Sequence, residues 1–291
     1  MREHITFGFV GIGLIGGSVA KALRRVYPSC KIIVYNRSAE PRVMAINDGT
    51  ANVAVPQVDE TFNECDYIFL CTPVEKNVEY LKILKDIIKD DCIITDVGSV
   101  KGNIHRAVKE LGLEKNFIGG HPMAGSEKTS YTYANDRLVE NAYYAITPTD
   151  AVSKERVEEF TEIVQGIGAI PINISYEEHD KVVATISHLP HLIAASLVNL
   201  VKHNDSKNEY MKTMAAGGFK DITRIASSSP EMWEQICLTN SSAISNILEQ
   251  YIEMLETIKD NIDKKTPGYV ASLFEMSREY RNFLESRHPE H

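Results

Sequence analysis

Short apolar runs alternate with helical stretches over the first half of the chain. The runs are rich in β-branched and aromatic residues, and this alternation is typical of a parallel sheet covered by crossover helices. Strands are expected at Ile5–Val10, Lys31–Asn36, Tyr67–Thr72, Cys92–Val97, Asn116–His121, Tyr143–Thr147 and Ala169–Ile174. Helices are expected between them at Ser18–Val26, Val74–Ile88 and Lys154–Ile167. The first half is therefore predicted to be an α/β domain.

The pattern changes from Glu177 onward, where apolar residues recur at three- and four-residue spacing and no strand-like run follows. Ser229 followed by Pro230 is expected to begin one long helix as its N-cap and first residue. The apolar stripe of this helix is formed by Ile236, Ile244, Ile247, Leu248, Tyr251, Ile252, Leu255, Ile258 and Ile262. Thr266 and Pro267 are expected to begin the last helix in the same way.

The second half is thus predicted to be all-helical, and the chain is expected to divide into domains at 1–175 and 176–291. One interpretation of the apolar stripe is packing within its own domain. The alternative is a homodimer formed through this half, because the helices together offer more apolar stripe than a small bundle buries.

Composition narrows the class of protein. The chain has 291 residues, of which 43% are hydrophobic and 24% charged, with a net charge of −9. This acidity argues against a sequence-independent nucleic-acid binder. Neither a signal peptide nor an 18-residue apolar run is recognised, so a cytoplasmic protein without a membrane segment is expected. No disulfide framework or metal site is expected from the spacing of Cys30, Cys65, Cys71, Cys92 and Cys237.

A glycine motif, G-x-G-x-x-G, directly follows the first predicted strand. In that position the first two glycines allow a tight turn and a close approach to a pyrophosphate, and the third lets helix and strand pack. A Rossmann-type, doubly wound sheet binding a dinucleotide is therefore predicted. The loop expected to bind it consists of Gly11, Ile12, Gly13, Leu14, Ile15 and Gly16.

The end of the second strand carries Asn36, Arg37 and Ser38, where an acid would hold the ribose of NAD. A neutral Asn followed by Arg and Ser can donate to the 2′-phosphate of NADP, but Asn can also bond to a free hydroxyl. Arg37 alternatively stacks on adenine or faces solvent. NAD and NADP both remain open.

The turn Cys71-Thr72-Pro73 follows the third predicted strand, at the sheet edge where ligands bind in open α/β folds. These residues are expected to contact the ribose or nicotinamide through their backbone, or else to form a purely structural turn. Cys71 is not expected to be a nucleophile, because no adjacent cation marks a thiol of low pKa.

Polar residues also gather after the next two strands, at Asp96–Ser99 and Gly119–Glu127. His121 lies between glycines and a proline at the end of a strand. A neutral imidazole there can accept a proton from a substrate hydroxyl. A structural histidine is the alternative, but the predicted cofactor crevice favours a catalytic one.

The sequence resembles the prephenate dehydrogenases, a family that includes arogenate dehydrogenases. The resemblance rests on the segments Gly11–Ser18, Asp96–Gly102, Gly119–Glu127, Ser187–His191 and Ala215–Ala226, followed by Pro230 and Trp233. It implies a nicotinamide-binding Rossmann domain followed by a helical dimerisation domain. It also implies oxidative decarboxylation of prephenate with NAD or NADP, and inhibition by tyrosine.

The resemblance further implies roles for individual residues. His121 would accept a hydrogen bond from the 4-hydroxyl of prephenate, and Ser99 would orient the imidazole and contact the nicotinamide. Hydride would leave substrate C4, and loss of CO2 would yield 4-hydroxyphenylpyruvate. Arg224 would bind a substrate carboxylate, rather than cap a helix or pair with Asp221. Lys220 departs from the arginine that is frequent in relatives.

Further matched residues would line the substrate site. These are His191, His179 near the domain junction, Ser126 as a donor, Glu127 at the entrance, Gly217 and Trp233. His188 falls on the same helical face as His191 but is not assigned a role. Pro190 is expected to kink or break the helix between these two histidines.

Three other classes of protein share parts of this pattern. In an arogenate dehydrogenase the substrate carries an amine in place of the keto group, and the sequence does not distinguish the two. A β-hydroxyacid dehydrogenase shares the two-domain plan but uses a lysine on a later helix, against the histidine and arginine present here. A non-catalytic nicotinamide sensor is disfavoured by His121, Ser99 and Arg224.

Overall fold

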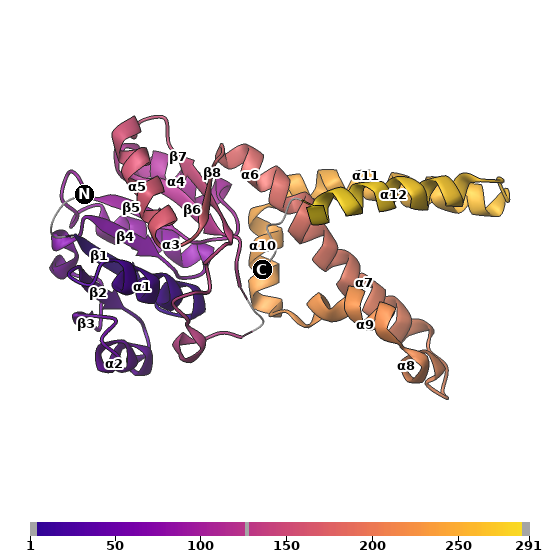
Figure 1. Ribbon diagram of the computed structural model, residues 1–291, viewed down its shortest axis with the longest axis horizontal. Coiled ribbons are helices and arrows are strands. Elements are labelled where there is room, and N and C mark those ends of the chain that lie inside the picture. The colour runs from indigo at the N-terminus through magenta and orange to yellow at the C-terminus, as the bar shows by residue number, and fades with distance from the viewer. Residues whose placement is uncertain (1–4, 126–127, 287–291) are drawn as a thin grey trace. The chain divides into compact units, whose positions relative to one another are not determined.

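The structure is a computed structural model that describes residues 5–125 and 128–286. The chain forms two compact units, Met1–Ala243 and Ile244–His291. The first unit contains two sheets and the helices up to residue 243 (Figure 1). The described part of the second is mainly helical.

A five-stranded parallel sheet forms the centre of the first unit. Its order is β3-β2-β1-β4-β5, which is the Rossmann order. The strands are β1 (Thr6–Val10), β2 (Lys31–Tyr35), β3 (Val53–Val55), β4 (Tyr67–Leu70) and β5 (Ile93–Asp96). Four of them confirm predicted strands. β3 was not predicted, because three residues are too few to show a period.

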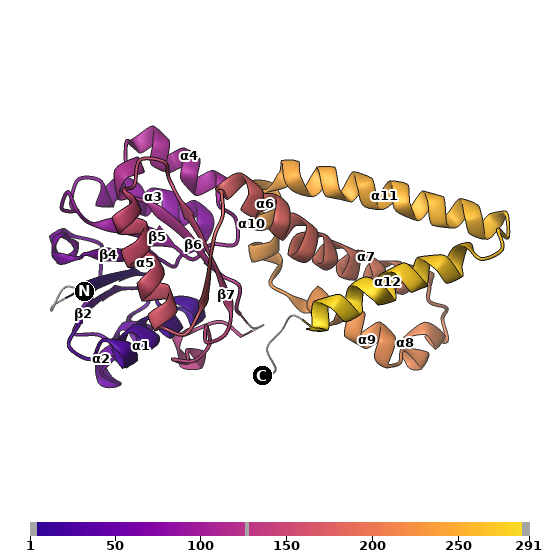
Figure 2. The ribbon, with the colours of Figure 1, turned by 45° about the horizontal axis from the view of Figure 1, so that its top comes forward.

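Helices cover both faces of this sheet, as a doubly wound fold requires (Figure 2). The helices α1 (Leu14–Val26) and α5 (Lys154–Gly166) share one hydrophobic core with one face of the strands. On the other face, α3 (Val74–Leu84) and α4 (Gly102–Leu111) form a second core. The remaining elements of this half are α2 (Ala39–Asn47) and the 3-10 turns η1 (Glu60–Glu64), η2 (Glu114–Asn116) and η3 (Tyr131–Tyr133).

A smaller sheet of order β6-β7-β8 continues from β5 through a parallel bridge between Ile94 and Phe117. Its strands are β6 (Ile118–Pro122), β7 (Tyr143–Pro148) and β8 (Ile170–Asn173). β7 runs antiparallel to β6, so the expectation of an all-parallel sheet was wrong here. The reason is that the connection from β6 to β7 contains no crossover helix in its described residues, only the short turn η3.

Beyond residue 175 the described part of the chain is helical, as predicted. The first unit contains α6 (Tyr176–Val183), the π turn η4 (Ala184–His188), α7 (Leu189–Asn204), α8 (Tyr210–Met214), α9 (Gly217–Thr223), the 3-10 turn η5 (Arg224–Ser227) and α10 (Pro230–Thr239). Pro190 does not break the helix. The irregularity is the π turn before it, which accommodates a residue without an N–H donor.

The predicted long helix after Pro230 is two helices. α10 ends at Thr239, and α11 (Ser241–Asp263) begins after Asn240, whose side chain bonds to the Asp180 carbonyl and His188 instead of facing solvent. Ser229 caps α10 as predicted, because its hydroxyl accepts from the Met232 N–H.

The start of the last helix was also predicted wrongly. α12 (Tyr269–Ser286) begins after Gly268, not at Pro267. Thr266 donates its N–H back to the Asn261 carbonyl, so it closes the end of α11 instead of capping α12. Gly268 has a φ of +78°, a left-handed conformation that favours glycine at this turn.

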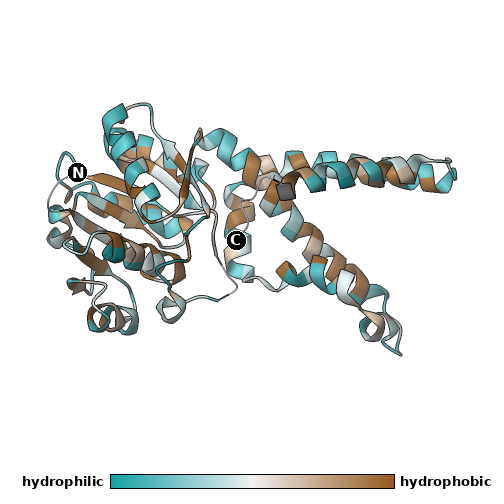
Figure 3. Ribbon diagram, viewed as in Figure 1, coloured by the Kyte–Doolittle hydropathy of each residue, from teal (hydrophilic) through white to brown (hydrophobic). Residues whose placement is uncertain are grey.

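Apolar side chains remain exposed on the helices of both units, and Figure 3 shows apolar positions along α7, α11 and α12. In the described residues, Tyr176–Asn204 is the one helical stretch long and apolar enough, by length and composition, to span a membrane. Its buried side, however, carries His179, Asp180 and His188, which bond to other parts of the protein. These are the contacts of a helix packed within a protein.

Candidate active site

The glycine loop between β1 and α1 has the geometry of a dinucleotide cradle. Gly11 adopts a φ of +94°, in the left-handed region. A Cβ on Gly16 would lie 2.4 Å from the Gly11 carbonyl oxygen, so only glycine fits there. A Cβ on Gly13 would meet nothing within 4 Å, which leaves open the side from which a pyrophosphate approaches.

The loop leads directly into α1, so the first N–H groups of this helix lie at the loop. No described side chain caps them, which leaves them available to an anion. Asn36 fixes the loop from the end of β2. Its side-chain oxygen Oδ1 accepts from the Ile12 N–H at 3.2 Å, and its side-chain nitrogen Nδ2 donates to the Ser38 backbone carbonyl at 3.4 Å. Arg37 and Ser38 are exposed beyond it. The loop, the helix end and these polar side chains fit a nicotinamide dinucleotide.

The turn after β4 borders the same loop. Thr72 is held by Asn77. The side-chain oxygen Oδ1 of Asn77 accepts from the Thr72 hydroxyl at 2.6 Å and from the Thr72 backbone N–H at 3.2 Å. The Asn77 amide nitrogen is buried and has no hydrogen-bond partner among the described residues. Burial raises the pKa of the Cys71 thiol, which agrees with the expectation that Cys71 is not a nucleophile.

A buried ion pair ties the two polar loops together. Lys101 and Asp96 are 0% and 1% exposed, and the ammonium of Lys101 bonds to the carboxylate of Asp96 and to the Gly120 carbonyl. The carboxylate also accepts from the N–H groups of Gly98, at 2.9 Å, and Gly120, at 3.2 Å. The backbone that immediately precedes His121 is therefore held by buried charged groups.

His121 lies on β6 and is bonded to a second histidine. Its Nδ1 is 2.9 Å from Nε2 of His179, and Nδ1 of His179 is 2.8 Å from Asp180 Oδ1. His179 and Asp180 are buried, whereas His121 is partly exposed. The Asp180 carboxylate also accepts from the N–H groups of Lys101 and Gly102, at 2.8 and 2.7 Å. The three side chains form one chain of hydrogen bonds.

Desolvation by the surrounding protein lowers the pKa of His121 well below its ordinary value, and the neighbouring His179, Lys101 and His188 lower it further. The imidazole is therefore neutral at physiological pH. A neutral imidazole can accept a proton, which is the property expected of a general base.

A second set of contacts leads from Asp180 to the helices. Asn240 donates its amide to the Asp180 carbonyl at 2.9 Å and to His188 Nδ1 at 3.2 Å. His188 lies edge-on to Trp233, and the Trp233 ring stacks on His191 with centroids 3.9 Å apart. His191 donates from Nδ1 to the Ser187 carbonyl at 2.8 Å. The Trp233 indole N–H is buried without a hydrogen-bond partner in the described chain.

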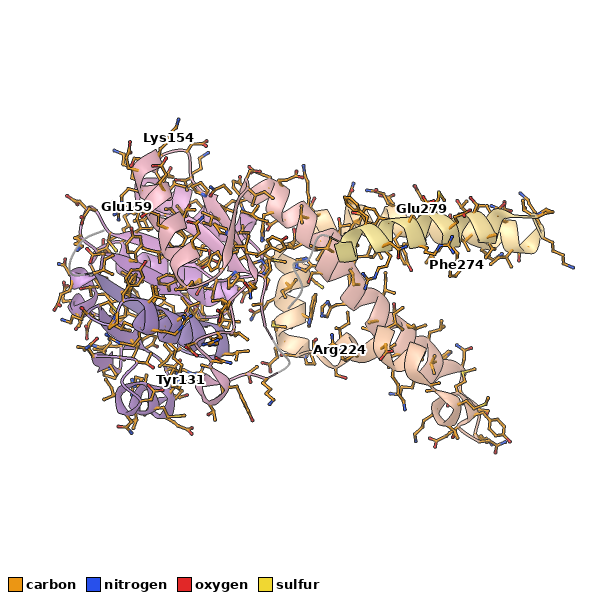
Figure 4. The ribbon with its side chains drawn as sticks, viewed as in Figure 1. Tyr131, Lys154, Glu159, Arg224, Phe274 and Glu279 are labelled. Carbon is orange, nitrogen blue, oxygen red and sulfur yellow. The ribbon has the colours of Figure 1, made fainter. Side chains whose placement is uncertain are left out.

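Arg224 begins η5, which packs against α7, the helix that carries His191 (Figure 4). Its side chain is exposed. Gly217 begins α9 and is also exposed, and a Cβ there would have only Asp221 Oδ2 nearby, at 4.0 Å. Crowding therefore does not require a glycine at this position.

Ser99 and His179 make contacts that differ from those expected. Within the described residues Ser99 makes no hydrogen bond to His121, and the partner that orients the imidazole is His179. Both ring nitrogens of His179 are occupied, so its position favours an action through His121 over a direct contact with substrate. Ser126 and Glu127 lie outside the described residues.

Asp180, Lys101 and Asn240 belong to this site but were not predicted. Lys101 lies in the segment Asp96–Gly102, and a lysine is usually solvated, so nothing in the sequence indicates its burial. The adjacent pair His179 and Asp180 was a usable signal, since a carboxylate next to a histidine often fixes its tautomer.

The Rossmann sheet, the open glycine loop after β1 and a neutral histidine near the end of β6 define a nicotinamide-dependent oxidoreductase. Comparison with known proteins agrees. The family model of the prephenate dehydrogenase nucleotide-binding domain matches residues 19–173, and that of the dimerization domain matches residues 175–276. The chain belongs to the prephenate dehydrogenase family.

Individual relatives support this assignment. The chain is 37% identical to the prephenate dehydrogenase of Bacillus subtilis over 97% of its own length and 76% of the relative's. The crystal structure of the A. aeolicus prephenate dehydrogenase with hydroxyphenyl propionate and NAD+ has a TM-score of 0.90 and 32% identity, and covers 96% of this chain and 98% of that one. The crystal structure of Synechocystis arogenate dehydrogenase has a TM-score of 0.87 and 27% identity, and covers 96% of this chain and 100% of that one. The predicted family, fold class and dinucleotide cofactor are confirmed.

Proposed function

We propose that this protein catalyses the oxidative decarboxylation of prephenate to 4-hydroxyphenylpyruvate and CO2, with NAD+ or NADP+ as the oxidant. The observation that carries the proposal is the neutral, partly exposed His121, which is held by buried groups near the end of β6, in a protein whose β1 ends in a dinucleotide loop. Its Nε2 makes no hydrogen bond to any described residue, so it can receive a substrate hydroxyl.

In this reaction the nicotinamide, when bound, accepts the hydride that leaves C4 of the substrate. His121 Nε2 takes the proton of the 4-hydroxyl as the carbonyl forms. The bond from the ring to its carboxylate then breaks, CO2 leaves, and the electron pair aromatises the ring. His121 returns the proton to the resulting phenolate oxygen, which balances the step. Ser99 is proposed to contact the nicotinamide from the loop after β5.

The substrate is a dianion and needs cationic and donor groups. We assign one carboxylate to the guanidinium of Arg224, which can bind it through two parallel hydrogen bonds. His191 and Trp233 are proposed to form a wall of the pocket, and the buried indole N–H without a partner is a donor suited to a ligand. Gly217 is proposed to approach the substrate through its backbone. Ser126 is proposed to donate to the substrate or cofactor, and Glu127 to control substrate entry.

Arogenate is the second candidate substrate, since a structural relative is an arogenate dehydrogenase. The deciding experiment crosses prephenate and arogenate with NAD+ and NADP+, and follows reduced nicotinamide and the aromatic product. The proposal expects turnover of prephenate with at least one cofactor. Turnover of arogenate alone, or of neither substrate, would overturn it. The same assay on Arg37→Ala and Ser38→Ala measures the contribution of these two residues to cofactor preference.

A homodimer is proposed through the helices after residue 175. The matched dimerization domain and the exposed apolar side chains of these helices support it, because large exposed apolar surfaces mark contact sites. In the first unit the exposed side chains include Leu200, Tyr210, Met214 and Leu238. In the second they include Ile252, Leu255, Phe274 and Met276. A monomeric mass in light scattering would contradict the proposal.

Three further properties are proposed. The division into domains at 1–175 and 176–291 is supported by the two family models, which meet between residues 173 and 175. A cytoplasmic location is supported by the cysteines Cys30, Cys65, Cys71, Cys92 and Cys237, all unpaired. Inhibition by tyrosine, which resembles the product, is tested by adding tyrosine to the turnover assay.

A further inference from the structure

We propose that Asp180 and His179 are positioning residues that fix the tautomer of His121, so that the lone pair of its imidazole lies on Nε2. The inference rests on the proposed function only for the use made of that lone pair. The protonation pattern itself follows from a neutral His179 and four hydrogen bonds: two from backbone N–H groups to Asp180, one between Asp180 and His179, and one between His179 and His121.

The first step concerns the charge of Asp180. Burial alone would raise the pKa of its carboxyl, but hydrogen bonds from His179 and from the N–H groups of Lys101 and Gly102 outweigh it and leave the pKa lowered. The carboxylate lies at the N-terminus of α4, a position that stabilises negative charge. A Cβ on Gly102 would be 3.0 Å from Asp180 Oδ2, so a glycine permits this approach. Asp180 is therefore ionised and only accepts hydrogen bonds.

The second step fixes His179. Because Asp180 cannot donate, the 2.8 Å contact requires a proton on His179 Nδ1. The proposal takes His179 as a neutral imidazole, in which a proton on Nδ1 leaves the lone pair on Nε2. His179 is 2% exposed, so water does not compete for either nitrogen.

The third step carries the pattern to His121. The contact between His179 Nε2 and His121 Nδ1 is 2.9 Å, and one of the two nitrogens must donate. Since His179 Nε2 accepts, His121 Nδ1 carries the proton. His121 is neutral, so its Nε2 is left with the lone pair. We call this series of hydrogen bonds from Asp180 through His179 to His121 the relay. Without it, the opposite tautomer of His121 would place a proton on Nε2, where it would block acceptance from a substrate hydroxyl.

The relay also connects the two parts of the family architecture. His121 lies within residues 19–173, matched by the nucleotide-binding model, whereas His179 and Asp180 lie within residues 175–276, matched by the dimerization model. The tautomer of the base is therefore set by the segment that follows the cofactor domain. Asp180 also bonds to the N-terminus of α4, which fixes α6 against the cofactor domain.

The test uses full-length protein with ¹⁵N-labelled histidine. The ring-nitrogen shifts of His121, assigned with His121→Asn, report which nitrogen carries the proton. We expect protonated Nδ1 and unprotonated Nε2 in the wild type, and a gain of the opposite tautomer in His179→Leu. A proton on Nε2 of His121 in the wild type would overturn the proposal, whatever the activity.

Turnover adds a second readout. His179→Leu should lower kcat by about 100-fold, at the lower end of the effect of general-base catalysis, with KM changed by less than about threefold. His179→Gln keeps an amide oxygen that can accept from His121 Nδ1, and should retain kcat within about tenfold of the wild type. His203→Leu, on the exposed end of α7, is the matched control and should change neither value.

Equal losses of kcat in the Gln and Leu variants, with dinucleotide binding intact, would overturn the positioning role. If His179→Leu does not fold, His179→Gln and the wild-type shifts still decide the question. Failure of the proposed function is distinguishable, because it would appear as absent prephenate turnover in the wild type while the ring-nitrogen shifts remain as expected.

Discussion

The buried pair of Lys101 and Asp96 gives the sharpest stability prediction. Lys101→Met keeps the length of the side chain but removes the ammonium, and leaves a carboxylate that is 1% exposed without its counter-charge. Breaking a buried ion pair by removing one partner costs about 3–5 kcal/mol of unfolding free energy. Because the N–H groups of Gly98 and Gly120 still bond to Asp96, we expect a loss of about 3 kcal/mol, at the lower end of that range.

Urea unfolding at neutral pH, followed by far-ultraviolet circular dichroism, measures this loss. The matched control is Lys31→Met, which breaks the pair of Lys31 with Glu64, whose side chains are 39% and 56% exposed. Such surface pairs contribute at most about 1 kcal/mol. The double variant Lys101→Met/Asp96→Asn should recover part of the loss, since the uncompensated charge is gone. Equal effects of Lys101→Met and Lys31→Met would refute the reasoning.

Three further predictions follow from the same contacts. Gly16→Ala should destabilise the protein by about 1–3 kcal/mol, because its Cβ would lie 2.4 Å from a carbonyl oxygen. Gly13→Ala should leave stability nearly unchanged but weaken dinucleotide binding. Thermal unfolding measures the first effect and titration calorimetry the second. Burial lowers the pKa of His105 and of His188 to about 4 from an ordinary 6.5. The unfolded chain therefore takes up protons first, and the free energy of unfolding should fall as the pH drops from about 6.5 toward 4. A pH series of urea midpoints that stays flat would contradict this. Arg224→Ala should raise KM for prephenate by about tenfold or more with a smaller change in kcat, and an unaltered KM would count against a carboxylate contact.

The fold was largely predictable because the parallel strands are buried on both faces and therefore form nearly continuous apolar runs. The boundaries that failed depend on contacts distant in sequence. Asn240 divides the predicted long helix because its amide reaches the Asp180 carbonyl and His188, 60 and 52 residues away. The antiparallel course of β7 follows from a connection without a crossover helix, and residue periodicity does not report strand direction.

The site was predictable where one residue type is chemically required. The glycines of the loop and His121 belong to this class. The supporting residues were not predictable, because a lysine such as Lys101 is exposed in most proteins. It is buried here because β5, β6 and α4 come together around it, where it bonds to Asp96 and to the Gly120 carbonyl. The bond between His121 and His179 spans 58 residues, and no local pattern encodes it.

The most direct test of the central claim compares wild-type protein with His121→Asn. The substitution removes the base while the dinucleotide loop stays intact. With saturating prephenate and cofactor, kcat should fall by about 100-fold to 10,000-fold, the range expected when a general base is lost. Reduced dinucleotide should bind both proteins with affinities within about threefold, since His121 does not belong to the glycine loop. Turnover of the variant within about tenfold of the wild type would contradict the assignment of His121 as the base.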